Sequence, residues 1–105
     1  MTRVHVQDED LTLDTATRSA TRAGREIRLT AREFDLLHYF ITHPGEVLTR
    51  EELLREVWGW SFGDPSTVTV HVRRLREKVE DDPGRPERLL TVWGVGYRWE
   101  TSAGR

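Results

Sequence analysis

The sequence predicts an α+β domain, on the basis of three observations. Over the first thirty residues, polar positions alternate with apolar residues or threonine in short runs, as is typical of antiparallel strands. Three stretches with the apolar spacing of a helix follow between residues 31 and 80. Two apolar runs on either side of Gly94-Val95-Gly96 then indicate a β-hairpin. We therefore expect a small sheet, three helices and a hairpin, in that order.

The N-terminal part contains four short runs of this kind, at residues 3–6, 11–13, 19–21 and 26–29. Turn-forming residues separate them, namely the acidic triplet 8–10, Asp14 and Ala23-Gly24. The runs therefore predict a small antiparallel sheet.

Two capping boxes predict where the first two helices begin. In the first, the Thr30 hydroxyl accepts from the amide of Glu33, whose carboxylate accepts from the amide of Thr30. Thr49 and Glu52 repeat the spacing. The first helix should run from Ala31 to Pro44-Gly45, and the second should end at Trp58-Gly59. The residues expected to face inward are Phe34, Leu37, Phe40 and Ile41 in the first helix, and Leu53, Leu54 and Val57 in the second.

A third helix is predicted over about residues 66–80. Asp64 is a suitable N-cap and Pro65 suits the first helical position, so the helix should begin near Ser66. The break is expected at residues 81–84, which read Asp-Asp-Pro-Gly. A narrow apolar stripe recurs at helical spacing, at Val68, Val72, Leu75 and Val79.

Length and composition predict one packed domain over residues 1–105, since 36% of the residues are hydrophobic and aromatic residues are spread along the chain. The chain has no cysteine, so it can form neither a disulfide nor a thiolate zinc site, which is compatible with the cytoplasm. No apolar run approaches the roughly 20 residues of a membrane-spanning helix, and the N-terminus has no signal-peptide pattern. We expect a cytoplasmic protein without membrane contact.

The formal net charge of −2 argues against a nucleic-acid partner, but the charges are segregated. Acidic residues gather at positions 8–10, 51–52 and 80–82. The third helix carries four basic residues against one acid, Glu77; they are Arg73, Arg74, Arg76 and Lys78.

The third helix is the candidate recognition helix, because a basic helix followed by a hairpin is the arrangement that enters the major groove with a wing beside it. On a helical wheel, Ser66, Val70, Arg73 and Arg74 lie opposite the apolar stripe. Arginine can read guanine, and Val70 can contact a thymine methyl group. Thr67, His71 and Arg76 flank this face and suit phosphate contacts.

Two other functional classes were weighed. Catalysis or metal binding needs converging groups, and the four histidines (His5, His38, His43 and His71) lie in unrelated settings without ligand spacing, so no enzyme, metal or cofactor is expected. A protein-interaction domain without sequence-specific DNA binding is the stronger alternative, since the chain is slightly acidic.

The chain resembles the DNA-binding effector domain of OmpR/PhoB-type response regulators. The resemblance covers nearly the whole chain and rests on four blocks in order, at residues 29–37 (LTAREFDLL), 43–51 (HPGEVLTRE), 67–78 (TVTVHVRRLREK) and 91–98 (TVWGVGYR). It implies a winged helix-turn-helix with a four-stranded N-terminal sheet, three helices and a C-terminal hairpin wing.

The resemblance also implies partners and site residues. Such regulators dimerise on tandem DNA half-sites when a receiver domain is phosphorylated. The receiver is absent from these residues, so we expect an excised domain or a regulator without one. The loop at 59–64 corresponds to the family's RNA polymerase contact, with Trp60 and Phe62 either touching that partner or folding back. The DNA-contacting positions are Val70, His71, Arg73, Arg74 and Arg76 on the helix and Thr91 at the wing.

Three positions depart from the family pattern, so base preference cannot be transferred. Ser66 lies where a relative can carry arginine, and Thr69 replaces the usual aspartate. Trp93 lies where many members have an arginine that reaches the minor groove. Because a tryptophan cannot neutralise a phosphate, we expect a weaker electrostatic contact with DNA at Trp93. We expect the indole to pack against the domain, and contact with a sugar edge of the DNA is the alternative.

Overall fold

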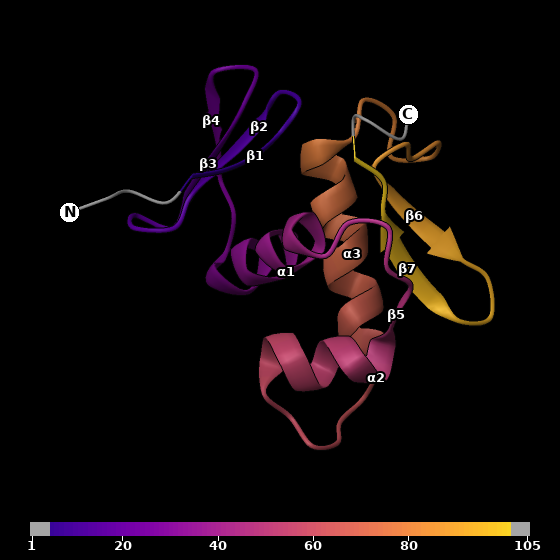
Figure 1. Ribbon diagram of the computed structural model, residues 1–105. Helices are drawn as coiled ribbons and strands as arrows, with labels where there is room; N and C mark the ends of the chain where they lie inside the picture. Colours follow the sequence, from indigo (N-terminus) through magenta and orange to yellow (C-terminus); the bar gives the residue numbers. More distant parts are fainter. Residues whose placement is uncertain (1–4, 102–105) are drawn as a thin grey trace.

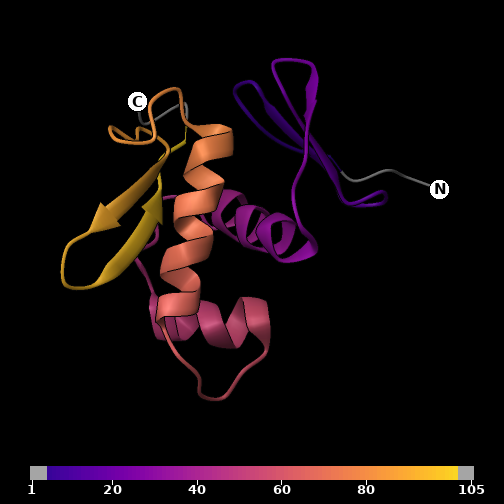
Figure 2. The same ribbon diagram turned by 180° about the vertical axis from the view of Figure 1, so that it is seen from behind.

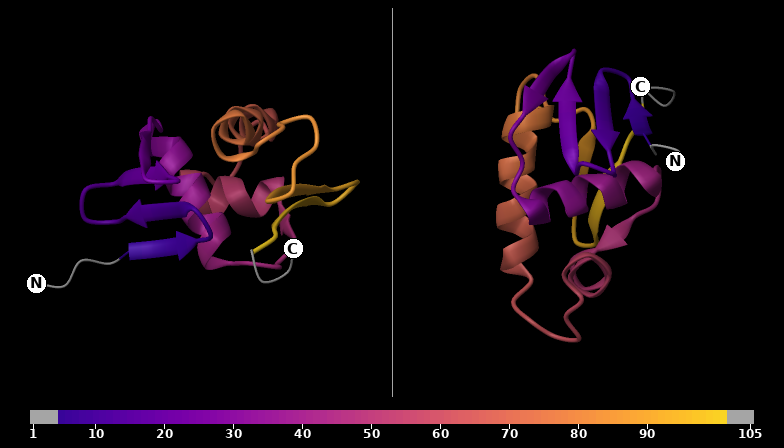
Figure 3. Two further views of the ribbon diagram at one scale, coloured as in Figure 1. Left: turned by 90° about the horizontal axis from the view of Figure 1, so that it is seen from above. Right: turned by 90° about the vertical axis from the view of Figure 1, so that its left-hand side faces the viewer.

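The computed structural model describes residues 5–101, which form two antiparallel sheets with three helices between them (Figures 1 and 3). The first sheet contains β1 (His5–Asp8), β2 (Leu11–Asp14), β3 (Ser19–Arg22) and β4 (Arg25–Ile27), paired in sequence order. The four-stranded N-terminal sheet is thus confirmed. Residues 3 and 4 of the first predicted run lie outside the described residues.

The turns of this sheet differ slightly from the prediction. Asp8 belongs to β1 rather than to the first turn, which begins at Glu9. Asp14 ends β2, and its Oδ1 accepts from the amides of Ala16 and Thr17 over 2.9 and 3.2 Å. This Asx-type turn explains why the residue is turn-forming although it remains in the strand.

The first helix, α1 (Ala31–Thr42), begins at the predicted capping box. The amide of Glu33 donates to Thr30 Oγ1 over 3.2 Å, and the amide of Thr30 donates to Glu33 Oε1 over 3.0 Å. The predicted apolar face of α1 is buried. Glu33 is buried as well, at 1% exposure, which the apolar pattern did not indicate.

The second helical segment has two parts, α2 (Arg50–Leu53) and a π-helical turn, η1 (Leu54–Trp58). Only half of the predicted capping box forms here. The Glu52 amide donates to Thr49 Oγ1 over 3.0 Å, but the Glu52 carboxylate accepts from the Thr49 hydroxyl and not from its amide. Thr49 also ends a short strand, β5 (Leu48–Thr49), which the sequence did not predict. Val57, expected inside, is half-buried, and Trp58 is buried instead.

The third helix, α3 (Ser66–Val79), carries the predicted stripe of four buried residues. Asp64 Oδ1 accepts from the amide of Ser66 over 2.9 Å, although Pro65 occupies the position next to the helix. The amide and the side chain of Ser66 both hydrogen-bond to the Asp64 carboxylate, and these two bonds lower the pKa of Asp64. At the other end, the buried Glu80 carboxylate accepts from the amides of Glu87, Arg88 and Leu89, which closes the loop after the helix.

The C-terminal hairpin consists of β6 (Leu89–Val92) and β7 (Gly96–Trp99), and it is the predicted wing. Strand β5 pairs with β7, which makes a three-stranded sheet in the order β5-β7-β6. A Cβ atom at Gly96 would overlap the carbonyl oxygen of Leu48, so only glycine allows this pairing. The helix that follows β5 is therefore held to the wing.

The helices form the middle layer of the molecule. Figure 3 shows the N-terminal sheet and the wing on opposite sides of them, and Figure 2 shows α3 passing in front of α1 toward the loop at the far end. Trp99 at the end of β7 is fully buried, and its Nε1 donates to Asp8 Oδ2 in β1 over 2.8 Å. Within residues 5–101, no helix is long and apolar enough to cross a membrane.

Candidate nucleic-acid interface

The face of α3 opposite the buried stripe is exposed over its whole length. Ser66, Thr69, Val70, Arg73 and Arg74 all lie on it. Neither Arg73 nor Arg74 makes a hydrogen bond or an ion pair with another described residue. Two full positive charges are thus available to a partner on this face.

His71 and Thr67 flank this face and are bonded to each other. The His71 Nδ1 lies 2.8 Å from the carbonyl oxygen of Thr67, and the ring meets that of Trp58 edge-on at 5.0 Å between centroids. Both residues are half-buried. These contacts fix the His71 ring against η1, so that only its other edge is available to a partner.

Arg76 connects α3 to the wing. Its Nε donates to the carbonyl oxygen of Leu89 over 3.0 Å, its Nη2 donates to Thr91 Oγ1 over 2.7 Å, and its guanidinium lies over the Tyr97 ring. Burial lowers the pKa of Arg76, while Tyr97 and Glu80 act in the opposite direction. Two residues that were predicted to contact phosphates, Arg76 and Thr91, therefore lie side by side and are hydrogen-bonded to each other.

Lys78, the last basic residue of the helix, turns away from the exposed face. Its Nζ lies 2.5 Å from Oε1 of the buried Glu33 in α1. Burial alone raises the pKa of Glu33, but the bonds from Lys78 and from the Thr30 amide outweigh it, and the pKa is lowered. Of the four basic residues of this helix, only Arg73 and Arg74 are therefore unpaired.

Trp93 is 88% exposed at the tip of the wing, so the prediction that its indole packs against the domain is wrong. The turn residue Gly94 has φ +79°, and the hairpin carries the indole beyond the core. A groove of about 430 Å³ separates this tip from α2 and α3. Trp93 and Val95 line its wing side, and Arg50 and Thr69 line its helical side.

Arg50 is a candidate that the sequence did not reveal. It is exposed at the first position of α2, and its Nη1 donates to Thr69 Oγ1 over 3.4 Å. Nothing in the sequence places Arg50 near the wing, because α2 is brought next to the wing only by the pairing of β5 with β7. The candidate interface thus contains a third exposed arginine.

The loop between η1 and α3 carries two aromatic residues with different surroundings. Phe62 is 90% exposed, whereas Trp60 is 43% exposed. The Trp60 ring lies 6.5 Å from that of Trp58 and also against Gly63, where a Cβ atom would overlap it. Trp60 therefore packs partly onto its own loop, and Phe62 does not.

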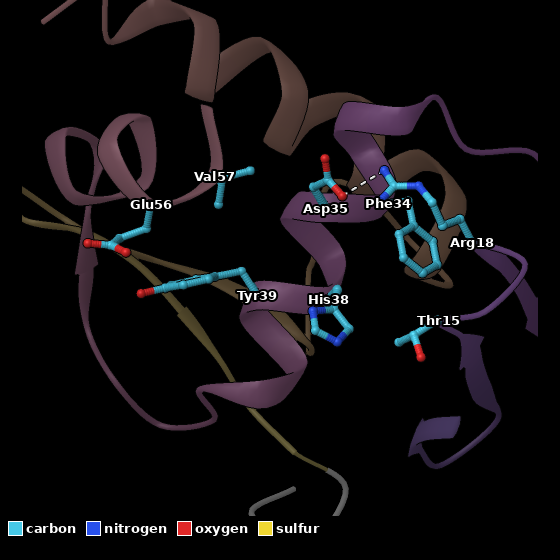
Figure 4. Close-up of a pocket in the computed structure, with 8 residues that line it drawn as sticks. All are labelled: Thr15, Arg18, Phe34, Asp35, His38, Tyr39, Glu56 and Val57. Carbon is cyan, nitrogen blue, oxygen red and sulfur yellow. Dashed lines mark hydrogen bonds and ion pairs between the residues drawn. The ribbon is translucent and has the colours of Figure 1, made fainter. Parts of the chain in front are cut away.

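A separate hollow of about 280 Å³ lies between the N-terminal sheet, α1 and η1 (Figure 4). Arg18 and Asp35 form an ion pair of 2.7 Å at one end, and Tyr39 and Glu56 lie at the other. Burial and the Glu56 carboxylate raise the pKa of Tyr39, which keeps its phenol protonated. The His38 ring lies between the two ends and makes no hydrogen bond with a described residue.

The fold and the exposed face of α3 define a winged helix-turn-helix domain. The family model for the C-terminal domain of transcriptional regulatory proteins matches residues 24–99. The chain belongs to this family, the OmpR/PhoB-type DNA-binding domains of response regulators. The family is a class of DNA-binding transcription regulators and not of enzymes, in agreement with the prediction. Within residues 5–101, no cluster of side chains is suited to a metal ion.

Solved structures resemble the chain over almost its whole length. It is 34% identical to the response regulator DrrB of Thermotoga maritima, with a TM-score of 0.83, and the match covers 91% of this chain and 44% of DrrB. It therefore spans less than half of that regulator. The RstA DNA-binding domain of Klebsiella pneumoniae, solved with the RstA box, is 32% identical, with a TM-score of 0.83 and coverage of 91% and 96%. The CpxR DNA-binding domain of E. coli is 29% identical, with a TM-score of 0.81 and coverage of 94% and 98%.

Proposed function

We propose that the chain binds double-stranded DNA sequence-specifically and acts as the output domain of a response regulator that controls transcription. In this proposal α3 enters the major groove and the hairpin lies beside it. The observation that carries it is the pair Arg73 and Arg74, exposed and unpaired on the outer face of the helix. The resemblance to the RstA domain, solved with its DNA box, supports the same function.

The exposed residues divide into two groups by their chemistry. Arg73, Arg74 and Val70 project from the middle of the helix, where bidentate and methyl contacts to base edges are made. Ser66 and Thr67 at the start of the helix, and His71, Arg76 and Thr91 at its sides, suit phosphate contacts that set the register. Since Arg76 and Thr91 are bonded to each other, they would meet the phosphate as one unit.

We further propose partners for the regulator as a whole. It would bind tandem half-sites as a dimer under the control of its own receiver domain, and the loop with Trp60 and Phe62 would contact RNA polymerase. The high exposure of Phe62 supports the loop contact. The length of DrrB, of which this chain matches 44%, supports a receiver in the complete regulator.

The decisive experiment is a titration of duplex DNA at several salt concentrations. If arginines neutralise phosphates, log affinity should fall linearly with log salt, with a slope of about −0.9 for each phosphate contacted. Arg76→Ala, which removes a proposed phosphate contact, should have a slope shallower by about one unit, and the Arg73→Ala/Arg74→Ala double variant should bind more weakly and with less sequence preference. Absence of salt-dependent binding would support the alternative, a winged helix that docks on proteins.

A further inference from the structure

The geometry around His71 determines which of its ring nitrogens carries a hydrogen. The His71 Nδ1 lies 2.8 Å from the carbonyl oxygen of Thr67, one turn earlier in α3. A carbonyl oxygen can only accept a hydrogen bond, so Nδ1 is the donor and carries the hydrogen. In the neutral ring Nε2 then has no hydrogen and can only accept, whereas in the imidazolium ion Nε2 also donates. Only the protonated ring can therefore donate a hydrogen bond from its Nε2 edge.

The neighbours of His71 keep the ring in this orientation. The Trp58 ring of η1 meets it edge-on at 5.0 Å between centroids, and the guanidinium of Arg32 lies over the same Trp58 ring at 5.5 Å. His71 is half-buried beside Thr67, on the flank of α3 where phosphate contacts are proposed. The oxygens of a DNA phosphate accept hydrogen bonds. A neutral His71 ring would thus place one acceptor against another.

We propose that His71 contacts a DNA phosphate only as the imidazolium ion, so that DNA binding takes up one proton at this residue. The inference rests on the proposed function and deepens it, because it makes the proton a second ligand of the DNA complex. Histidine is the side chain whose charge ordinarily changes between about pH 5 and 8, so the coupling acts near neutral pH. The contact is complete at low pH and is lost as the pH rises.

The elements that pack against His71 carry charges of both signs. The Glu33 carboxylate in α1 interacts electrostatically with His71 and is already bound by Lys78 of α3. Arg55 and Glu56 in η1 form an ion pair with each other. Further positive charges come from Arg32 over the Trp58 ring, Arg50 beside Thr69, and Arg74 one turn after His71. All of these groups are present with and without DNA, so the phosphate is the charge that His71 gains when the complex forms.

The test measures affinity for a duplex that the wild-type protein selects from a randomised pool, at constant ionic strength and between about pH 5.5 and 8.5. Wild-type affinity should fall about tenfold over this range, the scale of a contact made by only one protonation state. His71→Gln should lose this fall, because glutamine is a neutral donor at every pH.

His43→Gln is the matched control. The His43 Nδ1 lies 2.8 Å from the carbonyl oxygen of Tyr39, four residues earlier, as in the bond of His71 to Thr67. His43 follows the end of α1 and does not line the groove between α3 and the wing. This variant should keep the wild-type pH dependence. A wild-type affinity that is constant or rises with pH, or a fall that persists in His71→Gln, would overturn the proposal.

The salt dependence distinguishes a phosphate from a base as the partner of His71. If the imidazolium ion neutralises a phosphate, the slope of log affinity against log salt should be steeper by about 0.9 at low pH than at high pH. His71→Gln should show the same slope at both. Equal slopes in the wild type would assign the ring to a base edge and contradict the phosphate contact.

Calorimetry measures the proton in the wild-type protein and does not depend on a variant that folds. At about pH 7, the apparent binding enthalpy should differ between phosphate and Tris buffers, which have different ionisation enthalpies, and the difference should correspond to uptake of up to about one proton. Absence of uptake would overturn the proposal.

The two levels of the proposal fail in different ways. If the wild-type protein shows no salt-dependent binding to duplex DNA at any pH, the proposed function itself fails. If it binds with a salt dependence but with the same affinity at every pH, only the role of His71 is lost.

Discussion

Arg76 Nη2 donates a hydrogen bond of 2.7 Å to Thr91 Oγ1, which joins helix α3 to strand β6 of the wing. The two residues come from separate elements that a DNA duplex would contact at the same time. We expect Thr91→Val to destabilise the domain by about 1–3 kcal/mol, because it leaves a half-buried guanidinium nitrogen without its acceptor. Urea unfolding measures this loss. Thr91→Ser keeps the hydroxyl and serves as the control, and equal stability of all three proteins would contradict the expectation.

Arg74 is expected to read a base edge. Arg74→Ala should cost about 1–3 kcal/mol on the cognate site and relax the preference at one base pair. Binding profiles on a randomised duplex library compare the variant with the wild type. An unchanged preference with weaker binding would assign Arg74 to a phosphate instead.

Trp93→Arg tests the electrostatic consequence of the exposed wing tip. An added cation next to the duplex should tighten binding and steepen the slope of log affinity against log salt by about one unit. Measurements on one duplex across a salt series decide this. An unchanged slope in a folded variant would mean that position 93 does not face DNA.

Trp60 and Phe62 are expected to serve a protein partner. Replacement of both by serine should leave DNA affinity nearly unchanged and reduce transcription in a reconstituted system with RNA polymerase. Phe62→Ser alone should account for most of the loss, because Trp60 already packs against Trp58 and Gly63. Equal transcription from variant and wild type at saturating protein would mean that these side chains only shape the loop.

The ion pair between the buried Glu33 and the half-buried Lys78 predicts a pH dependence of stability. Since the pKa of Glu33 is lowered in the folded protein, its contribution is complete above the ordinary glutamate pKa of about 4.3 and is lost as the pH falls through the folded value. Urea unfolding at neutral pH and at about pH 3 should show a larger loss for the wild type than for Glu33→Gln. Equal losses would mean that the pair contributes nothing through its charge.

The sequence predicted what depends on near neighbours. The capping box of Thr30 and Glu33 and the apolar stripe of α3 are signals within one helix, and both formed as expected. Strand β5 was missed because a two-residue strand has no periodicity and exists only through its pairing with β7. The Lys78–Glu33 pair was missed because the partners are 45 residues apart. Trp93 was misjudged because an aromatic side chain usually packs on its own domain, and only the hairpin geometry shows that its tip projects beyond the core.

Strand β5 runs directly into α2 and is hydrogen-bonded to β7, so the start of α2 and the wing cannot separate without breaking a sheet. The Arg76 bond to Thr91 fixes α3 to the same hairpin. These contacts therefore hold α2, α3 and the wing in one arrangement relative to each other. If the domain binds DNA in the proposed way, the duplex has to fit the spacing between α3 and the wing. DNA sequences whose grooves narrow or widen at low energetic cost would then be favoured, even at base pairs that no side chain touches.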